Sequence, residues 1–315
     1  QMLDPRTGDW ALPLLDRFSL PSGILQPVTA AGTVLGPLRR SVAETTGLRD
    51  VNVVLPGTHD TASAVMAVPV DAGTQESGRW CYISSGTWSL MGMEIPQPVI
   101  NDRCLQLNFT NEGGVGQTVR LLKNIAGLWL VQQCRAAWVS EQEYDWEQLM
   151  TMAEESPART CLIDPDDARF VAPRDMPVEI QQYCQQSSQT VPETKGAVIR
   201  CALESLALRY RMVMEFLEDL TGRPMETIHI VGGGSQNRLL CQMTADACNR
   251  TVIAGPVEAT AIGNLMMQLV AAGAVSSISQ AREVVRASFE VEQYIPSDPD
   301  AWHEAADRFM GLLES

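Results

Sequence analysis

The first quarter of the chain changes character near residue 50: a segment rich in turn residues is followed by two apolar runs. Residues 1–50 are rich in turn residues, and only the segment Gly36–Thr46 has the spacing of a short helix. The apolar run Val51–Leu55 predicts a buried strand, and the small apolar residues Ala62–Val68 predict a helix that follows a tight turn. Val70–Gly78 carries Gly, Thr, Ser and charged residues, so we expect a linker there.

From Arg79 onward the apolar residues recur with a period of two, which is typical of strands. The elements expected over the next sixty residues are strands at 79–84, 88–93, 104–110 and 117–122 and a helix at 125–138. The first two strands are separated by Ser85-Gly86-Thr87, which predicts a hairpin turn.

The longest helical pattern runs from Thr194 to Leu220 and stops at Gly222, a residue type that commonly ends helices. Beyond it we expect strands at 228–231 and 252–254 and helices at 239–248, 258–272 and 300–313. Strands that alternate with helices predict a layered α/β fold with a mixed sheet and flanking helices.

Composition narrows the function classes. The chain has 315 residues, 45% of them hydrophobic, which is enough for a packed core in one large or two ordinary domains. A net charge of −15 disfavours nucleic-acid and anionic-membrane partners. The first ten residues show no signal-peptide pattern, and we expect a cytoplasmic protein. The eight cysteines form no CxxC pair and the three histidines are scattered, so we predict reduced thiols and no metal site.

Asp60 is the first candidate for chemistry. It follows the predicted buried strand and opens the predicted helix, which would place a carboxylate at the carboxyl edge of a sheet, where α/β folds bind ligands. Such an acid could take a proton from a hydroxyl nucleophile. Asp also caps helices well, and spacing alone favours capping. His59 is equally open to a ligand contact or a turn role.

Two glycine-containing turns are the other candidates. Ser84-Ser-Gly-Thr87 could form an anion-sized concavity, although a plain hairpin turn is favoured. Gly232-Gly-Gly234 directly follows a predicted strand and precedes a helix, so it could lie against a nucleotide or only allow tight packing. Asp71-Ala-Gly-Thr74 is similar to the D-x-G-T phosphate hairpin of actin-like ATPases, but Pro69 interrupts the preceding run and we expect a linker.

Taken in order, these segments resemble the FGGY family of carbohydrate kinases. The discriminating stretches are His59-Asp-Thr-Ala-Ser63 and Ser84-Ser-Gly-Thr-Trp88. Further matching segments are Thr110–Gly114, Leu122–Trp129, Ile228–Gly234 and Val252–Ala259. The resemblance begins near Thr7 and runs to the end of the chain.

The resemblance implies a ribonuclease H-like fold of the actin and hexokinase type, with substrates in a cleft between two lobes. It implies ATP-dependent phosphorylation of a ketose, with Mg²⁺ held largely by the phosphates. Asp60 would be the general base, and His59, Asp60 and Thr61 would contact the sugar. The residues implied for nucleotide binding are Thr87, Asn124, Gln132, Gly232 and Gly233.

One departure from the family limits these expectations. A complete member carries a D-x-G phosphate hairpin in a whole first lobe, and we expect residues 1–70 to be only the last part of that sugar-binding lobe. Residues 71–315 would then be the second, nucleotide-binding lobe. We therefore expect this chain alone to be an inactive fragment of a kinase, either a monomer or a homodimer. The alternatives are a non-catalytic adenine-nucleotide-binding lobe and a dimerising remnant.

Overall fold

The computed structural model describes residues 2–314. The strands are β1 (Leu3–Asp4), β2 (Asp9–Trp10), β3 (Val34–Pro37), β4 (Asn52–Val54), β5 (Trp80–Ser85), β6 (Trp88–Ile95), β7 (Thr110–Gly113), β8 (Val119–Ala126), β9 (Thr227–Val231), β10 (Thr251–Ala254) and β11 (Glu292–Tyr294). The α-helices are α1 (Leu12–Arg17), α2 (Arg40–Thr46), α3 (Asp60–Met66), α4 (Ala72–Ser77), α5 (Asp102–Gln106), α6 (Trp129–Trp138), α7 (Trp146–Glu154), α8 (Met176–Gln186), α9 (Lys195–Thr221), α10 (Arg238–Cys248), α11 (Ala259–Ala271), α12 (Ile278–Ser288) and α13 (Pro299–Glu314). Short 3-10 helices are η1 (Ser22–Ile24), η2 (Ala168–Phe170) and η3 (Gly233–Gln236).

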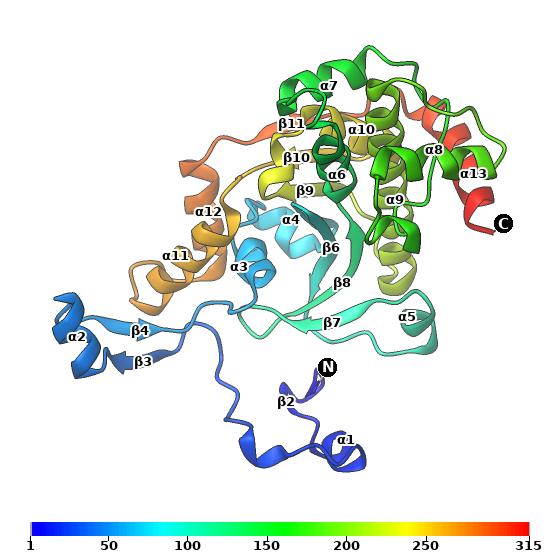
Figure 1. Cartoon of the computed structure of the whole chain (residues 1–315). Coiled ribbons are helices and arrows are strands. Elements are labelled where there is room, and N and C mark those ends of the chain that lie inside the picture. Colours follow the sequence, from blue (N-terminus) through cyan, green and yellow to red (C-terminus); the bar gives the residue numbers. More distant parts are fainter. Residues whose placement is uncertain (1, 315) are drawn as a thin grey trace. The chain divides into compact units, whose positions relative to one another are not determined.

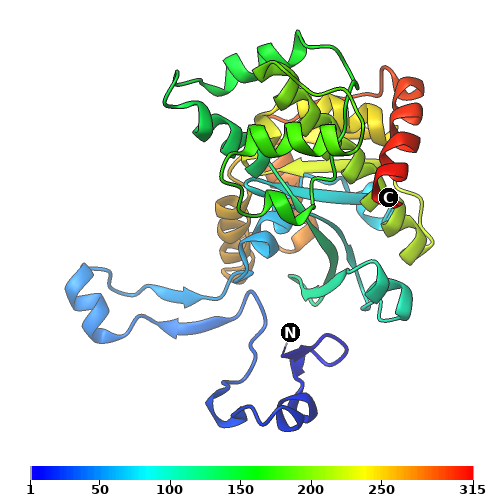
Figure 2. The same cartoon turned by 45° about the vertical axis from the view of Figure 1, so that its right-hand side comes forward.

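Seven strands form one mixed sheet in the order β11-β10-β9-β5-β6-β8-β7. Figure 2 shows the yellow-green β9 beside the cyan β5 in this sheet. Strand β9 pairs in parallel with both β5 and β10, so that Ile230 lies opposite Ile83 on one side and Ala254 on the other. Strand β5 then returns antiparallel as β6, with Ile83 opposite Met91. The side chains of β5 are buried on both faces of the sheet, as expected where helices cover both faces. The predicted α/β class with a mixed sheet is confirmed.

Contacts within the chain divide it into two compact units, which are described separately. Unit 1 comprises the chain up to Gly78 together with Met93–Leu122 and Glu258–Phe289. Unit 2 comprises Arg79–Gly92, Lys123–Val257 and the chain from Glu290 onward.

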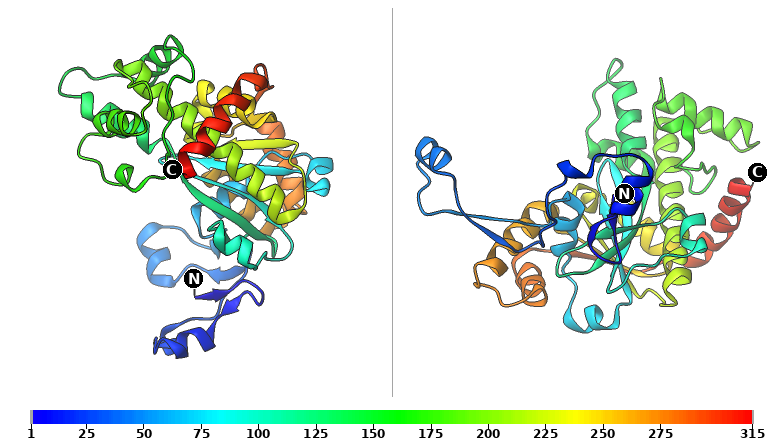
Figure 3. Two further views of the ribbon diagram at one scale, coloured as in Figure 1. Left: turned by 90° about the vertical axis from the view of Figure 1, so that its right-hand side faces the viewer. Right: turned by 90° about the horizontal axis from the view of Figure 1, so that it is seen from below.

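Unit 2 is built around α9. The side chain of Thr194 accepts a hydrogen bond from the Ala197 N–H at the first turn, and Gly222 ends the helix with a φ of 66°. This left-handed conformation suits glycine, and the predicted long helix is confirmed. Helices α7 and α10 pack on α9, and α13 lies along α10 (Figure 3).

Unit 1 contains one well-buried helix and a long exposed segment. Every residue of α3 from Thr61 to Met66 is buried, and α3 packs against α11. The segment before it is different: Leu15 is the one buried residue among residues 2–60. Strands β3 and β4 form a two-stranded sheet of their own with α2 at its tip (Figure 1).

Several predicted elements are wrong. The run Val51–Leu55 does not form a buried strand, because β4 pairs only with β3 and Val53 is 36% exposed. The short helix predicted from Gly36 begins only at Arg40, since Gly36 and Pro37 belong to β3. Val70–Gly78 is not a linker but contains the helix α4, which is capped by Asp71: its side chain accepts a hydrogen bond from the Thr74 N–H.

Two further boundaries differ in the middle of the chain. The expected strand at 104–110 begins as α5, which is capped by Asn101, and only its last residue enters β7. The expected helix from Ile125 starts at Trp129, because β8 continues to Ala126. Both errors come from apolar residues that fit either period over a short stretch.

No α-helix among residues 2–314 combines the length and the apolar character needed to cross a membrane. All eight cysteines are buried free thiols.

Candidate functional site

The three glycines after β9 have different surroundings: two are packed tightly against Ser85, and one faces open space. A β-carbon on Gly234 would lie 2.0 Å from the Ser85 Oγ, and one on Gly232 would lie 2.8 Å from the Ser85 carbonyl oxygen. Gly232 also has a φ of 87°, which strains any other residue. A β-carbon on Gly233 would meet no atom within 4 Å, and Gly233 is exposed. Packing therefore accounts for two of the three glycines, and Gly233 alone presents bare backbone to open space.

The turn between β5 and β6 lies next to this triplet, because Ser85 contacts Gly232 and Gly234. The same turn is hydrogen-bonded to the start of α6. Gly86 N–H donates to the Trp88 carbonyl at 2.9 Å, so the segment is the hairpin turn that the sequence favoured. The Leu128 N–H donates to the Gly86 carbonyl at 3.1 Å, and the Trp129 N–H donates to the Thr87 carbonyl at 3.0 Å. The backbone of Thr87 is thus fixed by α6, while its side chain is exposed.

The other two residues implied for nucleotide binding come from the elements on either side of this junction. Asn124 is exposed on β8, and Gln132 is half-buried on α6, one turn after Leu128. Unit 2 therefore contains all five implied nucleotide residues, carried by β8, α6, the β5–β6 turn and the triplet after β9.

A charged cluster that the sequence analysis missed supports β8 beside Asn124. Asp166 Oδ1 accepts from the Ala126 N–H at 2.7 Å, and Asp166 Oδ2 lies 3.2 Å from Arg209 Nε. Burial raises the pKa of Asp166, although the Arg209 charge opposes this, and burial lowers the pKa of Lys123. The charges are distant in sequence, and no spacing rule would have grouped them.

The implied sugar-side residues lie at the start of α3 in unit 1. The cap of α3 is His59, not Asp60: His59 Nδ1 accepts from the Thr61 N–H at 3.2 Å. Asp60 is the first helical residue, and its Oδ1 also accepts from the Thr61 N–H, at 2.7 Å. The Asp60 side chain is 78% exposed, whereas Thr61 is buried. His59 Nδ1 lies 3.1 Å from Asp60 Oδ1, and both atoms accept from the same Thr61 N–H.

The rest of unit 1 fixes α3 at both ends. A β-carbon on Gly263 of α11 would lie 1.8 Å from the Ser63 carbonyl oxygen, so the two helices meet backbone to backbone. The Thr260 hydroxyl lies 3.4 Å from the Asp60 carbonyl oxygen. At the far end, Arg282 donates to the Val65 carbonyl at 3.1 Å and forms a buried ion pair with Glu94.

The D-x-G-T segment that is similar to a phosphate hairpin has a structural role. Asp71 Oδ1 accepts from the Thr74 N–H at 3.0 Å, and Asp71 Oδ2 accepts from the Thr74 hydroxyl at 2.6 Å. Both carboxylate oxygens therefore serve the cap of α4. The segment contains no hairpin that could surround a phosphate.

Solved structures share the fold of this chain at low sequence identity. The gluconate kinase of Lactobacillus acidophilus matches 99% of this chain with a TM-score of 0.77 and 14% identity. The xylulose kinase of the same organism matches 99% with a TM-score of 0.76. The expected actin- and hexokinase-like architecture is therefore confirmed, and at this identity the likeness concerns the fold alone.

Closer relatives are found by sequence. The rhamnulokinase of Bacteroides thetaiotaomicron is 45% identical over 282 residues, which cover 90% of this chain and 56% of the relative. The rhamnulokinase of Bacillus subtilis is 41% identical over 300 residues, which cover 95% of this chain and 60% of the relative. This chain thus spans a little under two thirds of the length of the relatives it matches. The model of the C-terminal domain of FGGY carbohydrate kinases matches residues 81–272, more than half of the sequence. The chain belongs to the FGGY family of carbohydrate kinases.

Proposed function

We propose that this chain is part of an ATP-dependent kinase that converts L-rhamnulose to L-rhamnulose 1-phosphate in the cytoplasmic catabolism of L-rhamnose. The relatives named above are rhamnulokinases at 41–45% identity, which supports this substrate over other sugars. The proposed catalytic role rests on one observation, the exposure of the Asp60 carboxylate. It is a carboxylate left 78% exposed on a helix whose other residues are buried and fixed.

Asp60 would accept the proton of the sugar's C1 hydroxyl as that oxygen attacks the terminal phosphate of ATP. Phosphoryl transfer needs positioning and charge neutralisation more than covalent help, so one well-placed base suffices. The buried α3 and its neighbours α11 and α12 would hold the base in place. His59 and Thr61 flank Asp60 and would contact the ketose.

Unit 2 would bind the nucleotide. Gly233 offers exposed backbone without a side chain, which suits close approach of an adenosine. Thr87 would face the phosphates, and Asn124 and Gln132 would line the same site. Gly232, which packs on Ser85, would contribute by holding Gly233 in place. Mg²⁺ carried by the phosphates would offset their charge. In residues 2–314 the one cluster of three possible metal-ligating side chains consists of cysteines, which do not suit Mg²⁺.

We also propose that residues 1–70 are the last part of a sugar-binding lobe and that 71–315 form the nucleotide-binding lobe. Large apolar side chains are exposed throughout the first 54 residues, with Phe18 at 65% and Ile24 at 72%. Such a surface is expected where further protein normally packs. Alone, the chain would then bind ATP weakly and turn over no sugar, as a monomer or as a homodimer formed through this apolar surface.

The experiment compares two forms of the protein. One is the 315-residue chain. The other is a fusion protein: this chain is preceded by the part of the Bacillus subtilis rhamnulokinase that it does not match. ADP release is measured with L-rhamnulose and with ketoses that differ in stereochemistry, and the product is identified by NMR. We expect L-rhamnulose 1-phosphate from the fusion only. Preference for another ketose would contradict the substrate assignment, and turnover by the chain alone would contradict its proposed inactivity.

Calorimetric measurement of ATP–Mg²⁺ binding distinguishes the kinase from the alternative of a non-catalytic nucleotide-binding lobe. ATP–Mg²⁺ binding to an inactive fusion would favour that alternative. The dimerising remnant predicts a dimer in light scattering and no heat of ATP binding.

A further inference from the structure

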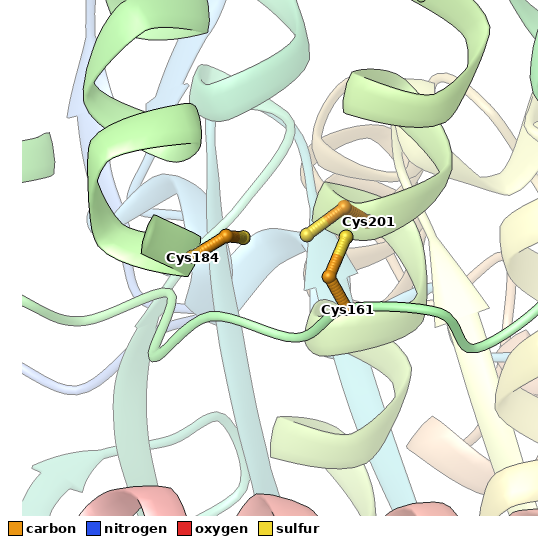
Figure 4. A group of neighbouring side chains, drawn as sticks. All are labelled: Cys161, Cys184 and Cys201. Atoms are coloured by element: carbon orange, nitrogen blue, oxygen red, sulfur yellow. The ribbon is translucent and has the colours of Figure 1, made fainter. Parts of the chain in front are cut away.

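Ser63 is the last residue of the motif His59–Ser63, and the proposed function gives it no role. It is 2% exposed and lies on α3, the helix that begins at Asp60. The three buried cysteines drawn in Figure 4 are different, because they lie on α8, on α9 and in the loop between α7 and α8. None of these segments carries a residue proposed to act. Ser63 is thus a buried polar group on the same helix as the proposed base.

The side chain of Ser63 closes the loop that leads into α3. Its Oγ donates to the Gly57 carbonyl oxygen at 2.7 Å, six residues earlier in the chain. Within the described part of the chain, residues 56–58 make no other hydrogen bond. The loop closed in this way contains the three residues proposed to act on the sugar, His59, Asp60 and Thr61.

The closed loop also rests directly on the first turn of α3. A β-carbon on Gly57 would lie 3.1 Å from the Ala62 Cβ and 3.2 Å from the Ser63 backbone nitrogen, which is closer than ordinary van der Waals contact. The absence of a side chain at Gly57 therefore lets its carbonyl reach the Ser63 hydroxyl.

The first turn of α3 depends on His59, which lies inside this loop. The His59 carbonyl accepts from the Ala62 N–H at 2.9 Å and from the Ser63 N–H at 3.2 Å. His59 Nδ1 accepts from the Thr61 N–H at 3.2 Å. Three successive amide groups thus have acceptors on one residue. Because Asp60 belongs to the same turn, the position of its carboxylate follows the position of His59.

The backbone of Ser63 is fixed by α11. A β-carbon on Gly263 would lie 1.8 Å from the Ser63 carbonyl oxygen, so the two helices meet closely at this residue. Ser63 therefore contacts the packed interior of unit 1 through its carbonyl and holds the loop through its hydroxyl.

We propose that Ser63 is a positioning residue for phosphoryl transfer: its hydroxyl ties Gly57 to α3, keeps His59 in place as the cap and thereby fixes the Asp60 carboxylate. The inference rests on the proposed role of Asp60 as the base. A displacement of about 1 Å of a reacting group can lower a rate about 10²-fold. Loss of the hydroxyl should therefore lower kcat. It should leave the KM for ATP unchanged, because the residues proposed to bind ATP belong to unit 2.

The first test measures ADP release by the fusion protein with L-rhamnulose. We expect Ser63→Ala to lower kcat about 10–100-fold with an unchanged KM for ATP. The matched control is Thr244→Val, which removes another buried hydroxyl that donates to a helical carbonyl, that of Leu240. The control should keep the wild-type kcat. A wild-type kcat in Ser63→Ala, or an equal fall in both variants, would overturn the proposal.

The second test needs no turnover and uses amide hydrogen exchange in the 315-residue chain. In Ser63→Ala the amides of residues 61–63 should exchange about tenfold faster, because their acceptor His59 is released, whereas Thr244→Val should leave them unchanged. Unchanged exchange in a folded Ser63→Ala variant would overturn the proposal.

The two tests separate this inference from the proposed function. A wild-type fusion that releases no ADP would contradict the proposed function, and hydrogen exchange would still decide whether Ser63 holds the loop. If Ser63→Ala does not fold, Gly57→Ala replaces it, because the added β-carbon presses on Ala62 and moves the same carbonyl away. Gly57→Ala should show the same fall in kcat and the same faster exchange, and wild-type values of both would overturn the proposal.

Discussion

The backbones of Gly263 and Ser63 touch so closely that a β-carbon on Gly263 would lie 1.8 Å from the Ser63 carbonyl oxygen. Gly263→Ala must therefore push α11 away from α3. We expect the free energy of unfolding in urea to fall by about 1–3 kcal/mol. Gly311→Ala is the matched control, because Gly311 is also helical but has no neighbour within 4 Å. It should raise stability by about 0.5–1 kcal/mol, and equal effects of the two variants would refute the packing argument.

Adjacent glycines of the triplet should respond in opposite ways to the same substitution. Gly234→Ala places a methyl group on Ser85, and we expect a loss of about 1–3 kcal/mol in unfolding free energy. Gly233→Ala meets only open space, so stability should stay the same or rise while the affinity for ATP–Mg²⁺ falls. Thermal melts and calorimetry check the pair. Unchanged ATP affinity in a folded Gly233→Ala variant would remove Gly233 from the nucleotide site.

The buried Arg282–Glu94 pair should matter most when only one partner is removed. Arg282→Leu leaves the Glu94 charge buried and the Val65 carbonyl without this donor, so we expect a loss of about 3–5 kcal/mol. The double variant Arg282→Leu/Glu94→Leu should recover part of that loss. A double-mutant cycle in urea measures the coupling, and additive effects would show that the pair does not act together.

Two carboxylates should give opposite dependences of stability on pH. The pKa of Asp166 is raised by burial, so the stability it contributes is present below the ordinary Asp value and is lost as the pH rises through its folded value. The pKa of Asp71 is lowered by the hydrogen bond from the Thr74 hydroxyl, so its contribution is present above the ordinary value and is lost as the pH falls.

The wild type is therefore compared with the Asp166→Asn and Asp71→Asn variants in urea between about pH 2 and 8, a range that extends below the ordinary Asp value as well as above it. As the pH rises, Asp166→Asn should gain stability relative to the wild type, and Asp71→Asn should lose it. The same direction of change for both variants would contradict the assigned causes.

Strong local signals were enough to predict much of unit 2. The long apolar period from Thr194 and the stop at Gly222 predicted α9 to within one residue at each end. The same reasoning failed for α4, where the glycine and charged residues suggested a linker although Asp71 and Thr74 carry a capping signal. It also failed for β4. The apolar run predicts a buried strand, but apolar residues in it, such as Val53, are exposed.

The candidate site could be predicted only where its residues are close in sequence. His59, Asp60 and Thr61 form one motif. The structure corrects two expectations about it: His59 and not Asp60 caps α3, and the strand before the motif, β4, is exposed and pairs only with β3. The supporting residues Gly263 and Arg282 lie about two hundred positions away, and neither belongs to a motif.

The role of Asp60 is tested most directly by ADP release from the fusion protein with L-rhamnulose, using Asp60→Asn and the matched control Asp71→Asn. Both substitutions replace a helix-start carboxylate by its isosteric amide, and only Asp60 is proposed as the base. We predict that Asp60→Asn lowers kcat about 10²–10⁴-fold with an unchanged melting temperature, while Asp71→Asn keeps the wild-type rate. Equal rates for the wild type and Asp60→Asn would contradict the account.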